Sequence, residues 1–106
     1  MKSLGEMTEM LKQAKDLQGK MQKLQAEMAA KTLEASSGGG MVKVKVNGRQ
    51  VILSINIDPE MTKQDDLEML QDLIVAAVNE ALRQSQEMMQ SEIGKLTGGM
   101  NLPGLF

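Results

Sequence analysis

Apolar side chains recur at alternating intervals of three and four residues through the first 30 positions, and this spacing constrains the fold most. The ladder consists of Met7, Met10, Ala14, Leu17, Met21, Leu24 and Met28. It predicts one helix from about Ser3 to Ala30, with a coiled-coil seam along one side. Because such a seam must be buried, we expect a homodimer whose interface is formed by Met10, Ala14, Leu17, Met21, Leu24 and Met28.

The side-chain inventory argues against an enzyme. The chain has 106 residues, no Cys, no His and a single aromatic residue, Phe106. This inventory excludes disulfides, histidine general bases and the usual zinc sites. We therefore expect no catalytic residue, no metal, no cofactor and no small-molecule substrate. No apolar run reaches the roughly 20 residues of a membrane span, and the first ten residues lack the apolar stretch of a signal peptide, so we expect a cytoplasmic protein without a membrane partner.

Charge is distributed unevenly around a net charge of −2. Residues 1–31 hold six Lys against four acidic residues, whereas residues 59–106 hold three basic residues against eight acidic ones. The basic side chains could contact phosphates, although such residues are more often a solvated face. Without aromatic side chains for base stacking, duplex DNA is favoured over a single strand as the anionic partner.

Residues 42–57 predict an antiparallel hairpin. The pair Asn47-Gly48 predicts a two-residue type I′ turn, which would place Val44 opposite Val51 and Val42 opposite Leu53. One apolar face would then consist of Val42, Val44, Val46, Val51, Leu53, Ile55 and Ile57. Residues 32–35 could add a third strand, and residues 36–40, with three consecutive Gly, are expected to form a loop.

A second helix is predicted over residues 62–96. Thr62 and Asp65 have the spacing of a capping box, and a broad apolar stripe from Leu67 to Leu82 should cover the hairpin. The acidic cluster Asp65, Asp66, Glu68 and Asp72 is better explained as a solvated helix start than as a metal site. The predicted layout is one domain with a helical arm (1–31), a sheet (32–58), a second helix (62–96) and a flexible tail (97–106).

Several motifs together resemble the YbaB/EbfC family of bacterial nucleoid-associated proteins. They are KQAKDLQGKMQ in the first helix, MVKVKVNG in the first hairpin strand, IDPE after the second, and the terminal GGMNLPGLF. The tail has a single proline, Pro103, where many relatives have two. The resemblance implies an α+β dimer of α-β-β-β-α order with projecting helical arms. It also implies double-stranded DNA as the partner, a location at the nucleoid, and a role in nucleoid organisation and gene regulation.

Two sets of basic residues are candidates for DNA contact under this resemblance. One comprises Lys12, Lys15, Lys20 and Lys23 of the first helix with Arg83 of the second, and the other comprises Lys43, Lys45 and Arg49 of the hairpin. The motifs do not distinguish between the sets. The alternative function is a non-enzymatic protein-protein interaction module that uses the Met-rich seam and the tail.

Overall fold

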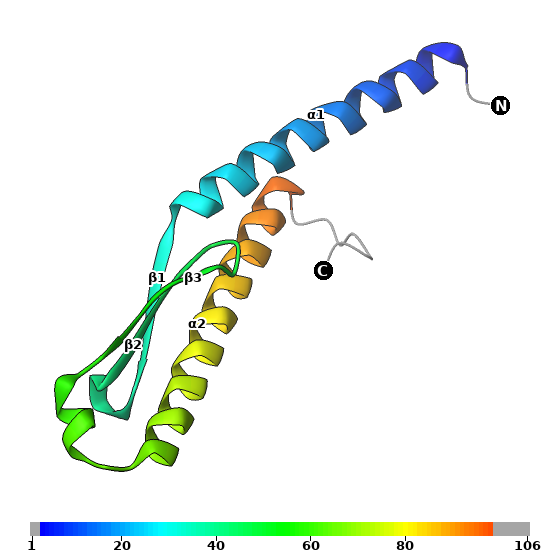
Figure 1. The fold of residues 1–106 in the computed structure, drawn as a ribbon. Coiled ribbons are helices and arrows are strands. Elements are labelled where there is room, and N and C mark those ends of the chain that lie inside the picture. Colours follow the sequence, from blue (N-terminus) through cyan, green and yellow to red (C-terminus); the bar gives the residue numbers. More distant parts are fainter. Residues whose placement is uncertain (1–2, 99–106) are drawn as a thin grey trace.

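Two long helices and a three-stranded antiparallel sheet make up the protein in the computed structural model, which describes residues 3–98 (Figure 1). The elements are α1 (Leu4–Ala30), β1 (Thr32–Ser37), β2 (Val42–Asn47), β3 (Ile52–Ile57) and α2 (Leu67–Leu96), with short 3-10 helices η1 (Gly38–Gly40) and η2 (Pro59–Lys63). This order confirms the predicted α+β fold class. Most of the predicted tail, residues 99–106, lies outside the described residues.

Helix α1 has the predicted extent. Ser3 is its N-cap, and the Ser3 Oγ accepts a hydrogen bond from the Glu6 backbone N–H at 3.2 Å, which satisfies one of the free donors of the first turn. The molecule measures 72 × 23 × 17 Å. Figure 1 shows why it is so long: the N-terminal half of α1 extends past the end of α2 and far from the sheet. We call this half, about residues 4–17, the arm.

Strand β1 is longer than predicted. Ser36 and Ser37, assigned to a loop from the sequence, are paired with Lys43 and Val42 of β2. Gly38–Gly40 and Met41 form the turn, and the three glycines have φ angles of 61°, 66° and 94°. Three consecutive residues at positive φ are inexpensive only for glycine, so the glycine run serves a tight reversal between two strands.

The predicted hairpin register is wrong. Val44 lies opposite Ile55 and Val42 opposite Ile57, with an irregularity between Lys45 and Val46, where the pairing shifts by one residue. Gly48 lacks the positive φ of a type I′ turn, whereas Gln50 has a φ of 64°. The turn is longer because the Asn47 Oδ1 accepts hydrogen bonds from the backbone N–H groups of Arg49 (2.8 Å) and Val51 (3.1 Å).

The Asn47-Gly48 pair docks the hairpin onto α1. The Gly48 N–H donates to the carbonyl oxygens of Met28 (2.9 Å) and Lys31 (3.1 Å), and the Asn47 Nδ2 donates to the Ala29 carbonyl oxygen (3.3 Å). A Cβ on Gly48 would lie 2.8 Å from the Met28 carbonyl oxygen. Glycine is therefore required here by close approach of two backbones rather than by its φ angle.

Helix α2 begins later than predicted. Its N-cap is Asp66, whose carboxylate accepts from the Met69 backbone N–H at 2.9 Å. Thr62 lies in η2, where its hydroxyl donates to the Pro59 carbonyl oxygen, so the predicted capping box of Thr62 and Asp65 is wrong. The chain turns between η2 and α2 at Asp65, whose φ is 50°.

One hydrophobic cluster lies where α2 crosses β1 and β2, and we call it the sheet core. Its buried members are Ala35, Val42, Val44, Val46, Ala77 and Ala81. The small side chains of Ala77 and Ala81 let the helix approach the β-branched residues of β2 closely. The second helix thus covers the sheet as predicted, but it covers β1 and β2 rather than β2 and β3.

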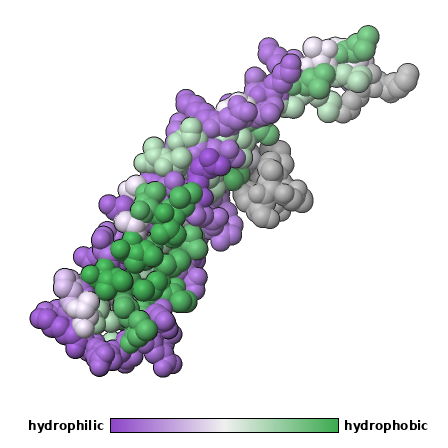
Figure 2. All heavy atoms as spheres, viewed as in Figure 1, coloured by the Kyte–Doolittle hydropathy of each residue, from purple (hydrophilic) through white to green (hydrophobic). Residues whose placement is uncertain are grey.

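Strand β3 carries an apolar strip that the helix leaves uncovered. Ile55 and Ile57 pair with buried valines of β2, yet their side chains are 43% and 38% exposed, and those of Val51 and Leu53 are 51% and 48% exposed. Only the β2 part of the predicted apolar face is therefore buried in a core. Figure 2 shows apolar residues gathered over the sheet and the adjacent part of α2.

A second cluster, which we call the arm junction, fixes the C-terminal part of α1 to the end of α2. Leu24, Met28 and Ile93 are buried in it, and Met21, Met88, Met89 and Leu96 pack around them. The C-terminal part of the predicted seam, with Leu24 and Met28, is consequently buried within the chain. Towards the N-terminus, Met7, Met10 and Leu17 are 52%, 51% and 38% exposed.

Candidate nucleic-acid interface

The lysines of α1 form the most concentrated basic surface. Between positions 12 and 23 the helix carries four lysines and a single acidic residue, Asp16, so this stretch has a net charge of +3. All four lysines are exposed, and none forms an ion pair with another residue of the described range 3–98. The stretch spans about 17 Å along the helix axis, so it offers several free cations along one rigid rod.

Lys95 lies beside this surface, a placement that sequence reasoning did not find. A groove of about 410 Å³ between the two helices is lined by Lys20, Lys23, Leu24, Glu27, Glu92, Lys95 and Leu96. Lys95 pairs with Glu92 at 3.2 Å, and the Glu92 side chain is the less exposed partner. No sequence pattern connects residues 20 and 95, because their proximity depends on how α1 docks onto α2.

The hairpin set does not converge. Lys43 and Lys45 alternate with buried valines, so they lie on the sheet face opposite α2, where Lys45 stands opposite Glu34 of β1 in the strand register. The other positions of that face are Thr32, Ser36, Ser54 and Asn56, all polar. This composition is that of a solvated sheet face, and one acidic residue lies beside the two lysines.

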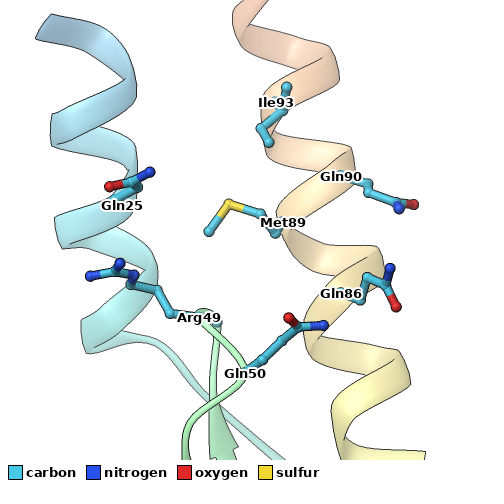
Figure 3. Close-up of a pocket in the computed structure, with 8 residues that line it drawn as sticks. Gln25, Arg49, Gln50, Gln86, Met89, Gln90 and Ile93 are labelled. Atoms are coloured by element: carbon cyan, nitrogen blue, oxygen red, sulfur yellow. The ribbon is translucent and has the colours of Figure 1, made fainter. Parts of the chain in front are cut away.

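Arg49 lies with the helices rather than with the two sheet lysines. It is part of the turn and lines a cavity of about 270 Å³ between α1, the turn and α2, together with Gln25, Gly48, Gln50, Gln86, Met89, Gln90 and Ile93. Figure 3 shows the Arg49 guanidinium pointing toward α1. Arg49 therefore lies beside the C-terminal part of α1 and not on the polar sheet face with Lys43 and Lys45.

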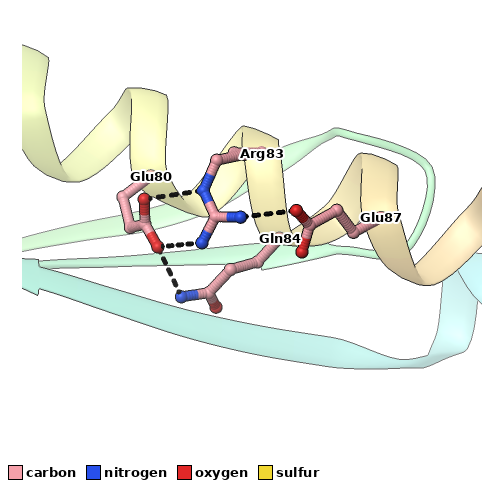
Figure 4. A network of polar contacts seen from close by, with 4 residues as sticks. All are labelled: Glu80, Arg83, Gln84 and Glu87. Atoms are coloured by element: carbon pink, nitrogen blue, oxygen red, sulfur yellow. Dashed lines mark hydrogen bonds and ion pairs between the residues drawn. The ribbon is translucent and has the colours of Figure 1, made fainter.

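Arg83 is already neutralised by its own helix. Its guanidinium forms ion pairs of 2.6 Å with Glu80 and 2.6 Å with Glu87, and its Nε donates to Glu80 at 3.0 Å (Figure 4). The hydrogen bonds from Arg83, and then from Gln84, lower the pKa of Glu80 to about 2, and the same pairing raises the pKa of Arg83. With two carboxylates on one guanidinium, this part of α2 is a poor phosphate site.

Other kinds of site find little support among residues 3–98. The structure brings no three acidic side chains together in a way that could hold a metal ion. Asp65 and Asp66 lie at the start of α2, where Asp66 acts as a cap. Within the same described part of the chain, no helix is long and apolar enough to cross a membrane.

Comparison with known proteins identifies a family. The model of the YbaB/EbfC DNA-binding family matches residues 2–100. A nucleoid-associated protein of Syntrophobacter fumaroxidans is 59% identical over 95 residues, which cover 90% of this chain and 86% of that protein. One from Caldanaerobacter subterraneus subsp. tengcongensis is 55% identical over 97 residues, covering 92% of this chain and 87% of the relative. The crystal structure of the uncharacterized protein HP0035 from Helicobacter pylori has the same fold, with a TM-score of 0.77 at 20% identity over 92% of this chain and all of the other.

Proposed function

The chain belongs to the YbaB/EbfC DNA-binding family, and from this premise we propose that it binds duplex DNA at the nucleoid as a homodimer, through backbone phosphates. The observation that carries the proposal is the basic stretch of α1, where Lys12, Lys15, Lys20 and Lys23 are exposed and unpaired within the described residues. Free lysines contact phosphates without reading the base sequence, so the contact has little sequence preference.

The shape of the molecule supports this use of the arm. A rigid helix that projects beyond the sheet can lie against a duplex without a clash from the rest of the protomer (Figure 1). The sheet lysines, by contrast, lie beside Glu34 on a flat polar face, and Arg83 is held by two carboxylates. Among the candidate residues, only Arg83 would have to break ion pairs within residues 3–98 to meet a phosphate, and the α1 lysines combine the absence of such ion pairs with the highest local positive charge.

The apolar surface that one protomer leaves exposed supports the proposed homodimer. The exposed apolar residues of β3, of the turn just before it and of α2 are Leu53, Ile55, Ile57, Val51, Leu67 and Val75, each at least 38% exposed. An apolar edge strand of this kind invites pairing with another chain. We place the principal dimer contact on this strip, because Leu24 and Met28 of the predicted seam are already buried within the chain.

A salt-resolved titration tests the DNA contact. Each lysine that releases a counterion should contribute about 0.9 to the slope of log K against log salt concentration. Replacing Lys12, Lys15 and Lys23 by Gln should therefore weaken duplex binding uniformly across sequences and reduce the slope by about 2 to 3. The control replaces Lys43 and Lys45 of the polar sheet face by Gln and leaves Arg49, which lies beside α1, unchanged. Equal losses in both variants, or an affinity of the native protein that does not depend on salt, would contradict the proposal.

Sedimentation tests the dimer separately. Ile55→Asp should convert the dimer to a folded monomer at micromolar concentration, because it places a charge in the middle of the proposed contact. Leu17→Asp, on the exposed part of the seam, is the comparison variant and should leave the dimer intact. If Leu17→Asp dissociates the dimer and Ile55→Asp does not, the arms rather than the sheets hold the subunits together.

A further inference from the structure

The arm junction concentrates one oxidisable side chain. Of its seven apolar residues, four are methionines: Met21, Met28, Met88 and Met89. The sheet core, which has about twice as many members, contains no methionine. The chain has no Cys, so the thioethers are its only readily oxidised sulfur groups.

Met21, Met88 and Met89 are all partly buried, so these methionines differ mainly in their position relative to a cavity. Met28 is fully buried, with 0% exposure. Met89 is partly buried, and it alone among them lines the cavity of about 270 Å³ between α1, the turn and α2. Figure 3 shows the Met89 sulfur pointing across this cavity toward α1, on the side where Gln25 lies. A cavity of this size admits a molecule as small as hydrogen peroxide.

We propose that Met89 is a site of reversible oxidation by peroxide, and that its sulfoxide weakens the attachment of α1 to α2. In this step the peroxide O–O bond breaks, one oxygen bonds to the Met89 sulfur, and the other leaves as water. The sulfur is oxidised by two electrons and the peroxide is reduced by two. A methionine sulfoxide reductase, which takes its electrons from a dithiol, reverses the change.

The consequence follows from what Met89 packs against. Its side chain joins the buried set Leu24, Met28 and Ile93, and no other apolar cluster holds α1 to α2 within residues 3–98. A sulfoxide is polar and larger than a thioether, so the oxidised side chain favours the polar lining of the cavity, which includes Gln25, Arg49 and Gln86, over its apolar contacts in the junction. The hairpin still holds the last turn of α1 through the Gly48 and Asn47 hydrogen bonds, so the expected effect is local opening rather than unfolding.

Hydrogen exchange on the 106-residue chain tests the proposal without DNA. After mild hydrogen peroxide treatment, peptide mass spectrometry should find the sulfoxide at Met89. Amide exchange over residues 17–30 should become about tenfold faster, while β2 stays protected. Met89→Leu, a volume-conserving change, should abolish this response. The matched control is Met69→Leu, at an exposed methionine of the same helix outside the junction, and it should respond like the native protein.

Two results would overturn the proposal. The first is a Met89 that stays reduced while exposed Met7 and Met69 are oxidised. The second is a Met89 sulfoxide with unchanged exchange in residues 17–30. A duplex-affinity measurement on the oxidised protein rests in addition on the proposed function: faster exchange with unchanged affinity supports the oxidation site and counts against DNA binding by α1.

Discussion

The sheet core and the arm junction are two apolar clusters along the same helix, and they differ in construction. The sheet core combines alanines of α2 with β-branched residues of β2, which have few rotamers and pack in one way. The arm junction is built largely from methionine and leucine, whose flexible side chains fill irregular gaps. The difference indicates that the sheet core specifies the fold, whereas the junction sets the position of an element that can be released locally.

The largest effect is expected from a charge in the sheet core. Val44 is fully buried between β1, β3 and α2, so Val44→Asp would place an unpaired carboxylate in that core. The whole domain should lose its cooperative unfolding transition in a urea titration followed by circular dichroism. Lys45→Asp, on the polar face of the same strand, is the control and should keep a transition. A cooperative transition in Val44→Asp would show that the sheet core does not govern global stability.

A truncation in the arm junction should act locally. Met28 is 0% exposed, and Met28→Ala leaves a cavity of the kind that costs about 2–5 kcal/mol in a core. Exchange of α1 amides should accelerate strongly, while β2 retains most of its protection. Met7→Ala, on the exposed arm, is the comparison and should leave exchange in residues 20–30 unchanged. Equal acceleration of β2 in Met28→Ala would mean that the two clusters unfold as one unit.

A pair of glycine substitutions should separate docking from helix propensity. Gly48→Ala forces a Cβ to within 2.8 Å of the Met28 carbonyl oxygen, and such overpacking costs about 1–3 kcal/mol. Gly19→Ala, on α1 with nothing within 4 Å, should stabilise the protein by up to about 1 kcal/mol. Urea unfolding should show a lower free energy of unfolding for Gly48→Ala and a higher one for Gly19→Ala. A neutral Gly48→Ala would show that the hairpin can move away from α1 without cost.

The smallest effect is expected from the surface ion pairs of α2 between the two clusters. Arg83 lowers the pKa of Glu80 to about 2 from its ordinary value of 4.5. Since the folded-state pKa is depressed, any stability that it contributes is present above pH 4.5 and is lost as the pH falls toward 2. In Arg83→Met the Glu80 carboxylate should titrate closer to its ordinary pKa in an NMR titration, with little change in stability at neutral pH because the pair is exposed. Arg83→Lys, which keeps the charge, should retain part of the shift.

Local patterns predicted the elements well. The ladder from Met7 to Met28 fixed the extent of α1, and the alternation of valine and lysine in residues 42–46 identified β2 and its buried face. The Arg83 ion pairs could have been predicted too, because Glu80 and Glu87 stand three and four residues away on the same helix. The family motifs predicted the DNA-binding family that the comparisons establish.

The prediction of the hairpin turn was wrong because residues distant in the sequence bind the turn. Asn47-Gly48 has the sequence of a type I′ turn, but the Gly48 N–H donates to the carbonyl oxygens of Met28 and Lys31, and the Asn47 side chain donates to that of Ala29. Ser85 of α2 completes this arrangement, since its hydroxyl donates to the Asn47 carbonyl oxygen at 2.7 Å and accepts from the Gln50 N–H at 3.0 Å. Turn statistics contain no information about a helix that arrives from elsewhere in the chain.

By itself, the amino-acid sequence determined which segments are helical or extended and which side of each is apolar, because these properties depend on spacings of two to four residues. Only the tertiary structure decided which apolar residues are buried within one protomer. Along a single ladder Leu24 and Met28 are covered by Ile93, whereas Met7 and Leu17 stay exposed beyond the end of α2. The physical reason is that burial requires a second surface, and where that surface ends is set by the docking of two helices distant in sequence.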